Sequence, residues 1–207
     1  MHGCAGCGPV QDIYARAACA AGVAAVIVDS LGPRGLGGSE AALTVCSGLR
    51  LRGAERADDL RLVLAWIRDQ PWADADRLAA AGWSHGGWSV MDGLAAGGLG
   101  QLKLAALFYP YAGVLSRTAA RGWGEARPAV FACLAGRDRV VGSAGPRRAL
   151  ARLEADGVPV QHLELPDATH AFDDPGAVDP RFHYRLDLAE QARAAYVAIL
   201  RQTLFDV

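Results

Sequence analysis

Short apolar runs alternate with longer segments of helical period along this chain. Most of these runs are nearly continuous in apolar residues, as a strand buried on both faces must be. The runs predict strands at residues 23–29, 78–83, 104–109, 129–135 and 160–165. The Ala/Leu/Arg-rich segments around them predict helices at residues 11–21, 53–69, 88–96, 146–155 and about 186–204. This alternation predicts an α/β fold, with a mostly parallel sheet flanked by helices.

The irregular residues gather in three segments that each follow the end of a predicted strand. These segments cover residues 30–48, 111–128 and 166–180. In an open α/β sheet, ligands bind outside the carboxyl ends of the strands. We therefore expect the functional residues to lie in these loops.

Composition indicates one folded domain spanning residues 1–207, because 52% of the residues are hydrophobic and neither a repeat nor a linker interrupts the chain. A formal net charge of −1 provides no basic field to attract nucleic acid. The longest apolar runs fall short of the roughly 20 residues that span a bilayer, and no signal-type stretch opens the chain. We expect a small-molecule partner, no nucleic acid and no membrane, and a cytoplasmic location for the chain as written.

The five cysteines are odd in number and scattered over the chain: Cys4, Cys7, Cys19, Cys46 and Cys133. This distribution is not typical of a disulfide framework. A reducing compartment is the simpler expectation.

The segment from Gly82 to Gly87 reads Gly-Trp-Ser-His-Gly-Gly and lies between a predicted strand and a predicted helix. It fits the G-x-S-x-G elbow, in which a sharp turn raises a nucleophilic serine above the sheet edge. The residues two before and two after the serine must be small, and Gly82 and Gly86 meet that requirement. The alternative is a glycine-rich turn in which Ser84 only caps the helix.

A serine hydroxyl needs a base beside it and a carboxylate that orients the base, and in α/β-hydrolases these follow the serine in the order acid, then histidine. Asp138 follows the predicted strand 129–135, and His170 follows the predicted strand 160–165. Both therefore lie at the same sheet edge as Ser84. Asp138 could instead be an ordinary turn residue, whereas His170 is the one histidine in the loop after the last strand. We predict catalytic roles for Ser84, Asp138 and His170.

The same chemistry requires two backbone N–H groups that stabilise the oxyanion. His85 follows the nucleophile and supplies the first, and the His2-Gly3-Cys4 loop makes the Cys4 amide the second candidate. Arg34 is a candidate for binding a substrate carboxylate, although a solvated loop arginine is the favoured alternative. Trp88 and Tyr109 are candidates for lining the pocket, with core packing an equal alternative.

These motifs resemble those of the dienelactone hydrolase family of α/β-hydrolases, nearly end to end. The matching segments are His2-Gly3-Cys4, Val28-Asp29-Ser30, the elbow, Gly136-Arg137-Asp138 and Ala168-Thr169-His170-Ala171-Phe172. The resemblance implies hydrolysis of an ester or lactone through an acyl-enzyme, with no cofactor and no metal. The namesake enzymes carry cysteine in the elbow, so Ser84 implies the general esterases of the family rather than dienelactone activity.

The sequence also departs from the family at its beginning, because the strands that precede the His-Gly loop in that family are missing. We expect an incomplete N-terminal part of the sheet, and an export signal lost with it would make the protein periplasmic or secreted.

Two other readings remain. One is a redox or metal module built on the C-x-x-C spacing of Cys4 and Cys7, which lacks the second ligand pair of a zinc site. The other is an inactive α/β-hydrolase relative that only binds its ligand, since a fold alone does not establish chemistry.

Overall fold

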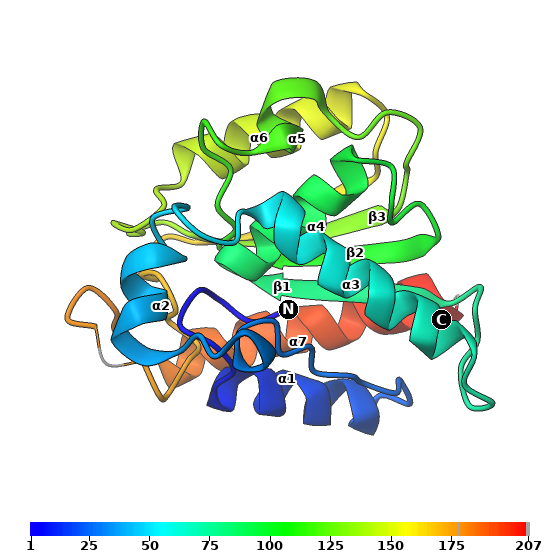
Figure 1. Ribbon diagram of the computed structural model, residues 1–207, viewed down its shortest axis with the longest axis horizontal. Coiled ribbons are helices and arrows are strands. Elements are labelled where there is room, and N and C mark those ends of the chain that lie inside the picture. The colour runs from blue at the N-terminus through cyan, green and yellow to red at the C-terminus, as the bar shows by residue number, and fades with distance from the viewer. Residues whose placement is uncertain (178, 206–207) are drawn as a thin grey trace.

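The computed structural model describes residues 1–177 and 179–205, and its centre is a parallel four-stranded sheet. The strands are β1 (Leu78–Trp83), β2 (Leu102–Phe108), β3 (Ala129–Ala135) and β4 (Val160–Leu165), and they lie side by side in chain order (Figure 1). Trp83 pairs with Phe108, and Phe108 pairs with Cys133. The carboxyl ends of the strands therefore meet at one edge, which is where the predicted site residues follow.

Helices cover both faces of the sheet (Figure 1). On one face lie α3 (Gly53–Arg68), α4 (His85–Ala95), the short α5 (Arg117–Arg121) and α6 (Ala144–Ala155), and on the other lie α1 (Pro9–Ala20) and α7 (Leu186–Phe205). The three crossovers between neighbouring strands pass over the same face because parallel crossovers are right-handed. A 3₁₀ turn at Gly32–Arg34 and α2 (Gly38–Thr44) complete the elements.

Two hydrophobic clusters hold these layers together. The first packs α3, α4 and α6 on the sheet through residues such as Leu94, Leu107 and Leu153.

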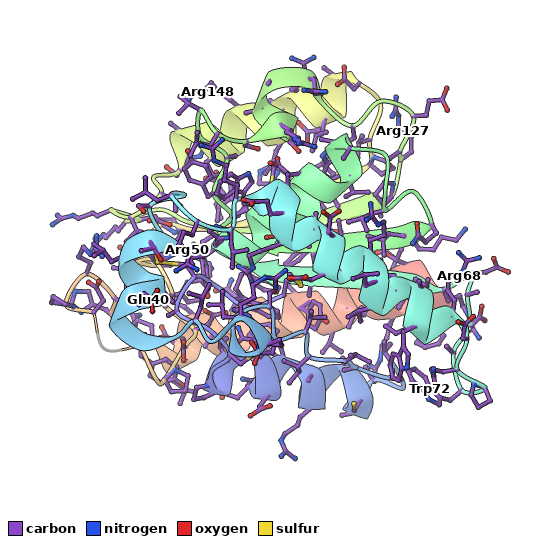
Figure 2. All side chains as sticks on the ribbon, viewed as in Figure 1. Glu40, Arg50, Arg68, Trp72, Arg127 and Arg148 are labelled. Carbon is purple, nitrogen blue, oxygen red and sulfur yellow. A yellow bond between two sulfur atoms is a disulfide. The ribbon has the colours of Figure 1, made fainter. Side chains whose placement is uncertain are left out.

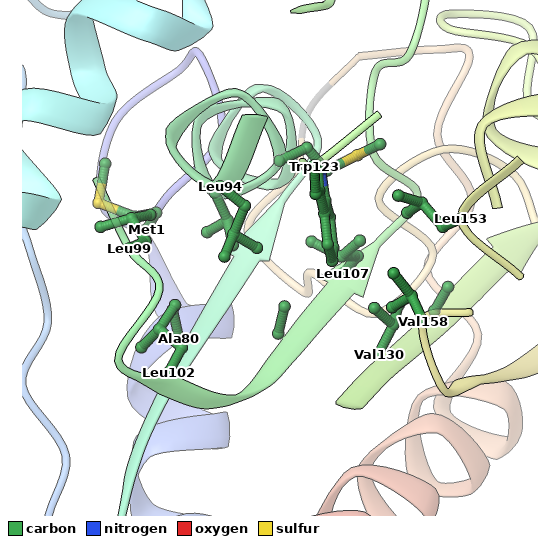
Figure 3. Packing of buried hydrophobic residues seen from close by; sticks show 14 of the residues in the cluster. Met1, Ala80, Leu94, Leu99, Leu102, Leu107, Trp123, Val130, Leu153 and Val158 are labelled. Atoms are coloured by element: carbon green, nitrogen blue, oxygen red, sulfur yellow. The ribbon is translucent and has the colours of Figure 1, made fainter. Parts of the chain in front are cut away.

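 In Figure 3, Trp123 lies above Leu107 of β2 with Leu94 of α4 beside them, and Leu153 of α6 lies near Val158 in the same cluster. The second cluster packs α1 and α7 on the opposite face, where the Tyr14 ring lies 4.8 Å from the ring of Phe108. Burial of such side chains contributes about 1.5–3 kcal/mol each.

Charged side chains project from the outer surfaces of the helices and loops (Figure 2). Many of them form exposed pairs, such as Arg50 with Glu40 at 2.8 Å. Exposed pairs of this kind contribute little to stability. Among the described residues, no helix is long and apolar enough to cross a membrane.

The structure contains four of the five predicted strands, and the prediction for residues 23–29 is wrong. This segment has no regular secondary structure and pairs with no strand among the described residues. A cleft of about 270 Å³, lined by Val26, Val28, Leu78 and Ala80, separates it from β1. An apolar run becomes a strand only when a neighbouring backbone accepts and donates its hydrogen bonds, and none of the strands β1 to β4 does so for this segment.

The cysteine prediction is also wrong, because a disulfide joins Cys4 to Cys46, which lies just beyond α2. The two residues are 42 positions apart, so their spacing in the sequence does not identify them as a pair. Disulfides persist mainly in oxidising surroundings, and the argument for a reducing compartment therefore loses its basis. Cys7, Cys19 and Cys133 are free.

Candidate active site

Ser84 occupies a strained turn between β1 and α4. Its backbone has φ 53° and ψ −115°, outside the regions that side-chain-bearing residues favour. The turn is possible because its flanking positions are glycines: a Cβ at Gly82 would lie 2.5 Å from the backbone carbonyl of Gly86. A Cβ at Gly86 would collide with the carbonyl oxygens of Met1 and His2. The sequence therefore folds locally so that the Ser84 hydroxyl stands at the sheet edge.

His170 and Asp138 meet Ser84 at that edge. His170 follows β4, and its Nε2 lies 2.8 Å from Ser84 Oγ, while its Nδ1 lies 2.7 Å from Asp138 Oδ2. Asp138 follows β3, and its other oxygen accepts hydrogen bonds from the backbone N–H groups of Val140 and Val141 at 2.8 and 3.0 Å. The structure thus brings together three residues that are separated by up to 86 positions in the chain.

These three side chains are largely shielded from water. The Asp138 side chain is 2% exposed and that of His170 is 5% exposed. Burial of Asp138 opposes ionisation, but hydrogen bonds from His170 and from the Val141 and Val140 amides outweigh it and lower its pKa. Asp138 is therefore a carboxylate at neutral pH, suited to orienting an imidazole.

A second carboxyl group, Asp173, contacts the His170 ring through Tyr109, and the sequence did not predict it. It is buried and accepts a hydrogen bond from the Tyr109 hydroxyl at 2.7 Å. The Tyr109 ring in turn packs edge-on against the His170 ring, with centroids 4.8 Å apart. Burial raises the pKa of Asp173. Its position three residues after His170 is a signal that could have been noticed, although a pair of loop acids is common.

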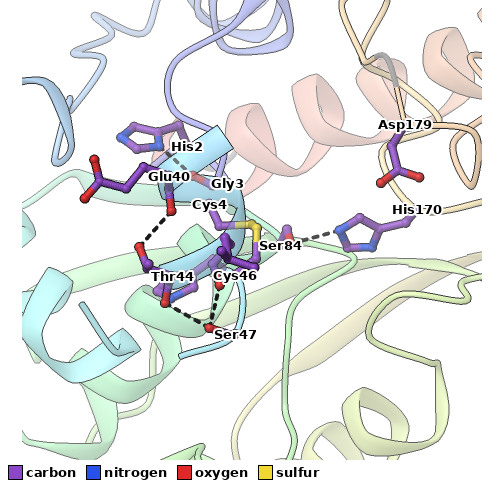
Figure 4. Close-up of a disulfide and its surroundings, with 12 residues drawn as sticks. His2, Gly3, Cys4, Glu40, Thr44, Cys46, Ser47, Ser84, His170 and Asp179 are labelled. Carbon is purple, nitrogen blue, oxygen red and sulfur yellow. Dashed lines mark hydrogen bonds between the residues drawn. A yellow bond between two sulfur atoms is a disulfide. The ribbon is translucent and has the colours of Figure 1, made fainter. Parts of the chain in front are cut away.

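The two segments that carry the predicted oxyanion donors both lie next to Ser84. The N-terminal loop is fixed on β1, because the Met1 ammonium donates to Ala81 at 2.6 Å and the Trp83 amide donates to the Met1 carbonyl at 3.1 Å. Gly3 therefore lies against the nucleophile: a Cβ added at Gly3 would lie 3.8 Å from the Ser84 Cβ. Figure 4 shows Cys4 and its disulfide beside Ser84. His85 begins α4 directly after the nucleophile.

The sequence of the chain matches the model of the dienelactone hydrolase family over residues 10–204. The chain belongs to the dienelactone hydrolase family. The resemblance noted from its motifs is therefore confirmed, and family membership makes this protein a hydrolase that acts on esters. A search among curated proteins finds no significant match.

Solved structures show the same α/β-hydrolase fold. A dienelactone hydrolase-like promiscuous phosphotriesterase from metagenomic libraries has a TM-score of 0.82 and 19% identity, with 98% of this chain and 84% of that one covered. A putative dienelactone hydrolase from Klebsiella pneumoniae has a TM-score of 0.72 and 18% identity, with 97% and 84% covered. A carboxylesterase from Lactobacillus plantarum has a TM-score of 0.58 and 18% identity, with 72% and 68% covered.

The three residues predicted to bind substrate contact other side chains of this protein instead. The Arg34 guanidinium donates to both oxygens of Asp59 at 2.8 Å, so its charge is already paired within the protein. Trp88 is 2% exposed, and its indole N–H donates to Asp92 at 2.7 Å. Tyr109 is 3% exposed and packs behind His170. Trp88 and Tyr109 thus pack in the interior, and we do not assign any of the three to the substrate.

The reading of Cys4 and Cys7 as a redox or metal pair is contradicted, because Cys4 pairs with Cys46. Cys7 does group with His2 and Asp29, whose ligand atoms lie within 4.8 Å of one another. However, the His2 Nε2 already accepts a hydrogen bond from the Ser30 amide at 3.1 Å. Asp29 Oδ1 likewise accepts from two backbone amides, at 3.0 and 2.9 Å. His2 Nε2 and Asp29 Oδ1 are thus already engaged by backbone donors.

Proposed function

We propose that this protein is a serine esterase or lactonase that cleaves a small-molecule substrate through an acyl-enzyme intermediate. The observation that carries the proposal is the pair of short contacts made by His170, 2.8 Å to Ser84 Oγ and 2.7 Å to Asp138 Oδ2. Nucleophile, base and orienting acid thus stand in the order that acyl transfer requires. Membership of an ester hydrolase family supports the same chemistry.

In the first half of the reaction, His170 Nε2 accepts the hydroxyl proton as Ser84 Oγ attacks the ester carbonyl carbon. The carbonyl oxygen becomes an oxyanion, which accepts hydrogen bonds from the His85 and Cys4 amides. The intermediate collapses when His170 returns its proton to the leaving alkoxide. The alcohol departs, and the acyl group remains on Ser84.

The second half repeats these steps with water in place of Ser84. His170 takes a proton from the water, the hydroxide attacks the acyl carbon, and the proton passes to Ser84 Oγ as the acid leaves. Asp138 stays ionised throughout and stabilises the imidazolium that forms twice in each cycle. No cofactor takes part in these steps.

The test is hydrolysis of a short-chain p-nitrophenyl ester, together with labelling by a fluorophosphonate read from the intact mass. The unchanged chain should take up one label, and Ser84→Ala should lose both labelling and turnover, the latter by about 10⁴-fold or more. Ser47→Ala is the matched control, because Ser47 is an exposed serine whose hydroxyl donates to the backbone carbonyls of Leu43 and Thr44. A folded but unlabelled protein would refute the proposal and favour a ligand-binding relative.

A further inference from the structure

Arg56 is a fully buried cation that has no carboxylate partner among residues 1–177 and 179–205. It lies in α3, has 0% exposure, and is the largest of the fully buried side chains. No carboxylate oxygen of the described residues lies within 4.0 Å of its guanidinium. Burying an unpaired charge costs several kcal/mol, and a neutral side chain would fill the same space at lower cost. Packing alone therefore does not explain why an arginine occupies position 56.

The guanidinium divides its hydrogen bonds between the two sides of the candidate oxyanion hole. One terminal nitrogen donates to His85 Nδ1 at 3.0 Å, and the other donates to the His2 carbonyl at 2.8 Å. The Nε group points to Ser30 Oγ at 3.3 Å. Burial and the positive charge of Arg56 lower the pKa of His85 to about 3 and that of His2 to about 4, so both rings are neutral acceptors.

We infer that Arg56 is the positioning residue of the oxyanion hole, holding both amide donors in one rigid arrangement. The inference rests on the proposed function. His85 carries one donor amide, and the His2 carbonyl lies two residues before the Cys4 amide in the same loop. A guanidinium is planar and its N–H groups have a fixed fork geometry, so one side chain sets the separation of the two segments.

The charge of Arg56 has a second effect on the same site. Its pKa is lowered by burial to about 10, so it remains a cation at neutral pH. A buried positive charge beside the two donor segments favours the oxyanion over the neutral carbonyl. Lysine would keep the charge but lose the fork, so it should not replace Arg56.

The variants that test this inference are Arg56→Gln and Arg56→Lys. Loss of one oxyanion donor typically lowers kcat by about 10²–10³-fold, and we expect a loss of this size in Arg56→Gln. Arg56→Lys should lose at least about tenfold, with KM nearly unchanged in both, because the interaction strengthens only as charge develops. Arg61→Gln and Arg61→Lys are the matched controls, since Arg61 is an exposed arginine of the same helix, 3.2 Å from Asp58.

A pair of inhibitors separates this role from general damage. A trifluoromethyl ketone forms an adduct with Ser84 that carries an oxyanion, whereas the corresponding trifluoromethyl carbinol binds without forming one. In the Arg56 variants, the Ki of the ketone should rise by the same factor as kcat/KM falls, and the Ki of the carbinol should stay constant. Parallel weakening of both inhibitors would overturn the inference, as would wild-type kcat in Arg56→Lys.

A further variant covers the case in which the Arg56 variants do not fold. His85→Leu keeps the backbone amide but removes the ring that accepts from Arg56, and it should lower kcat and weaken the ketone while the carbinol still binds. Unchanged kcat in His85→Leu would overturn the inference. If the unchanged chain itself takes up no fluorophosphonate, the proposed function fails, whereas a labelled chain with fully active variants refutes only the role of Arg56.

Discussion

Removing the disulfide between Cys4 and Cys46 should destabilise the protein and loosen the active-site loop. The double variant Cys4→Ser/Cys46→Ser opens a crosslink between residues 42 positions apart. In the chain-entropy model, a loop of this length stabilises the folded state by about 4 kcal/mol at 25 °C. For a chain of 207 residues, this corresponds to a decrease in Tm of roughly 10 °C.

The local packing makes this crosslink important. The α2 region is held by a small hydrophobic cluster of Leu31, Leu36, Ala41 and Val45, while the Leu43 side chain is 74% exposed. Such a cluster buries little apolar area compared with the two that flank the sheet. The disulfide therefore fixes both α2 and the Cys4 amide, and its loss should also lower kcat.

Thermal unfolding followed by circular dichroism measures the stability effect, with and without a reductant. Cys19→Ser is the matched control, because Cys19 is exposed and free, and it should leave Tm unchanged. A double variant with the Tm of the unchanged protein would refute the reasoning. So would an unchanged protein whose Tm does not fall when the disulfide is shown by mass to be reduced.

Three further predictions concern the site. Gly86→Ala forces a Cβ into the carbonyl oxygens of Met1 and His2, so it should lower the free energy of unfolding by at least about 1–3 kcal/mol and abolish fluorophosphonate labelling. Gly100→Ala is the control, because a Cβ at Gly100 would meet no atom within 4 Å, and it should change neither quantity. Asp138→Asn should lower kcat by about 10⁴-fold in ester hydrolysis. Because the pKa of Asp138 is lowered in the folded state, the stability that its carboxylate contributes is present above about pH 4 and is lost as pH falls through the lowered pKa. The free energy of unfolding of the variant, measured with urea, should therefore depend less on pH in the acid range. Burial raises the pKa of Asp173, so the stability that its protonated carboxyl contributes is full below about pH 4 and is lost as pH rises through the raised pKa. Asp173→Asn should remove this decline in the free energy of unfolding. If the free energy of unfolding of the variant, measured with urea between pH 4 and 8, follows that of the unchanged protein, this prediction is wrong.

Much of the sheet could be predicted because strand formation in β1 to β4 depends on local apolar runs and on neighbours that are present. The same runs did not predict α2 and α5, which lie in segments expected to be loops. These short helices depend on tertiary contacts, since isolated helices of this length are not stable in water. The segment 23–29 has strand-like composition, but its pairing depends on what lies beside it.

The sequence by itself determined the elbow and the edge at which the site residues meet. Gly82, Ser84 and Gly86 are adjacent in the chain, and their spacing follows from the steric limits of one turn. Asp138 and His170 could be placed because parallel strands direct their following loops to one edge.

Only the tertiary structure decided which partners the cysteine and arginine side chains around the site have. The pairing of Cys4 with Cys46, the engagement of Arg34 by Asp59, and the burial of Arg56 all join residues at least 25 positions apart. Cysteine and arginine side chains have no local signature that distinguishes these states from exposed ones. Their roles depend on which groups the packed helices and loops bring within hydrogen-bond distance, and that is a property of the whole fold.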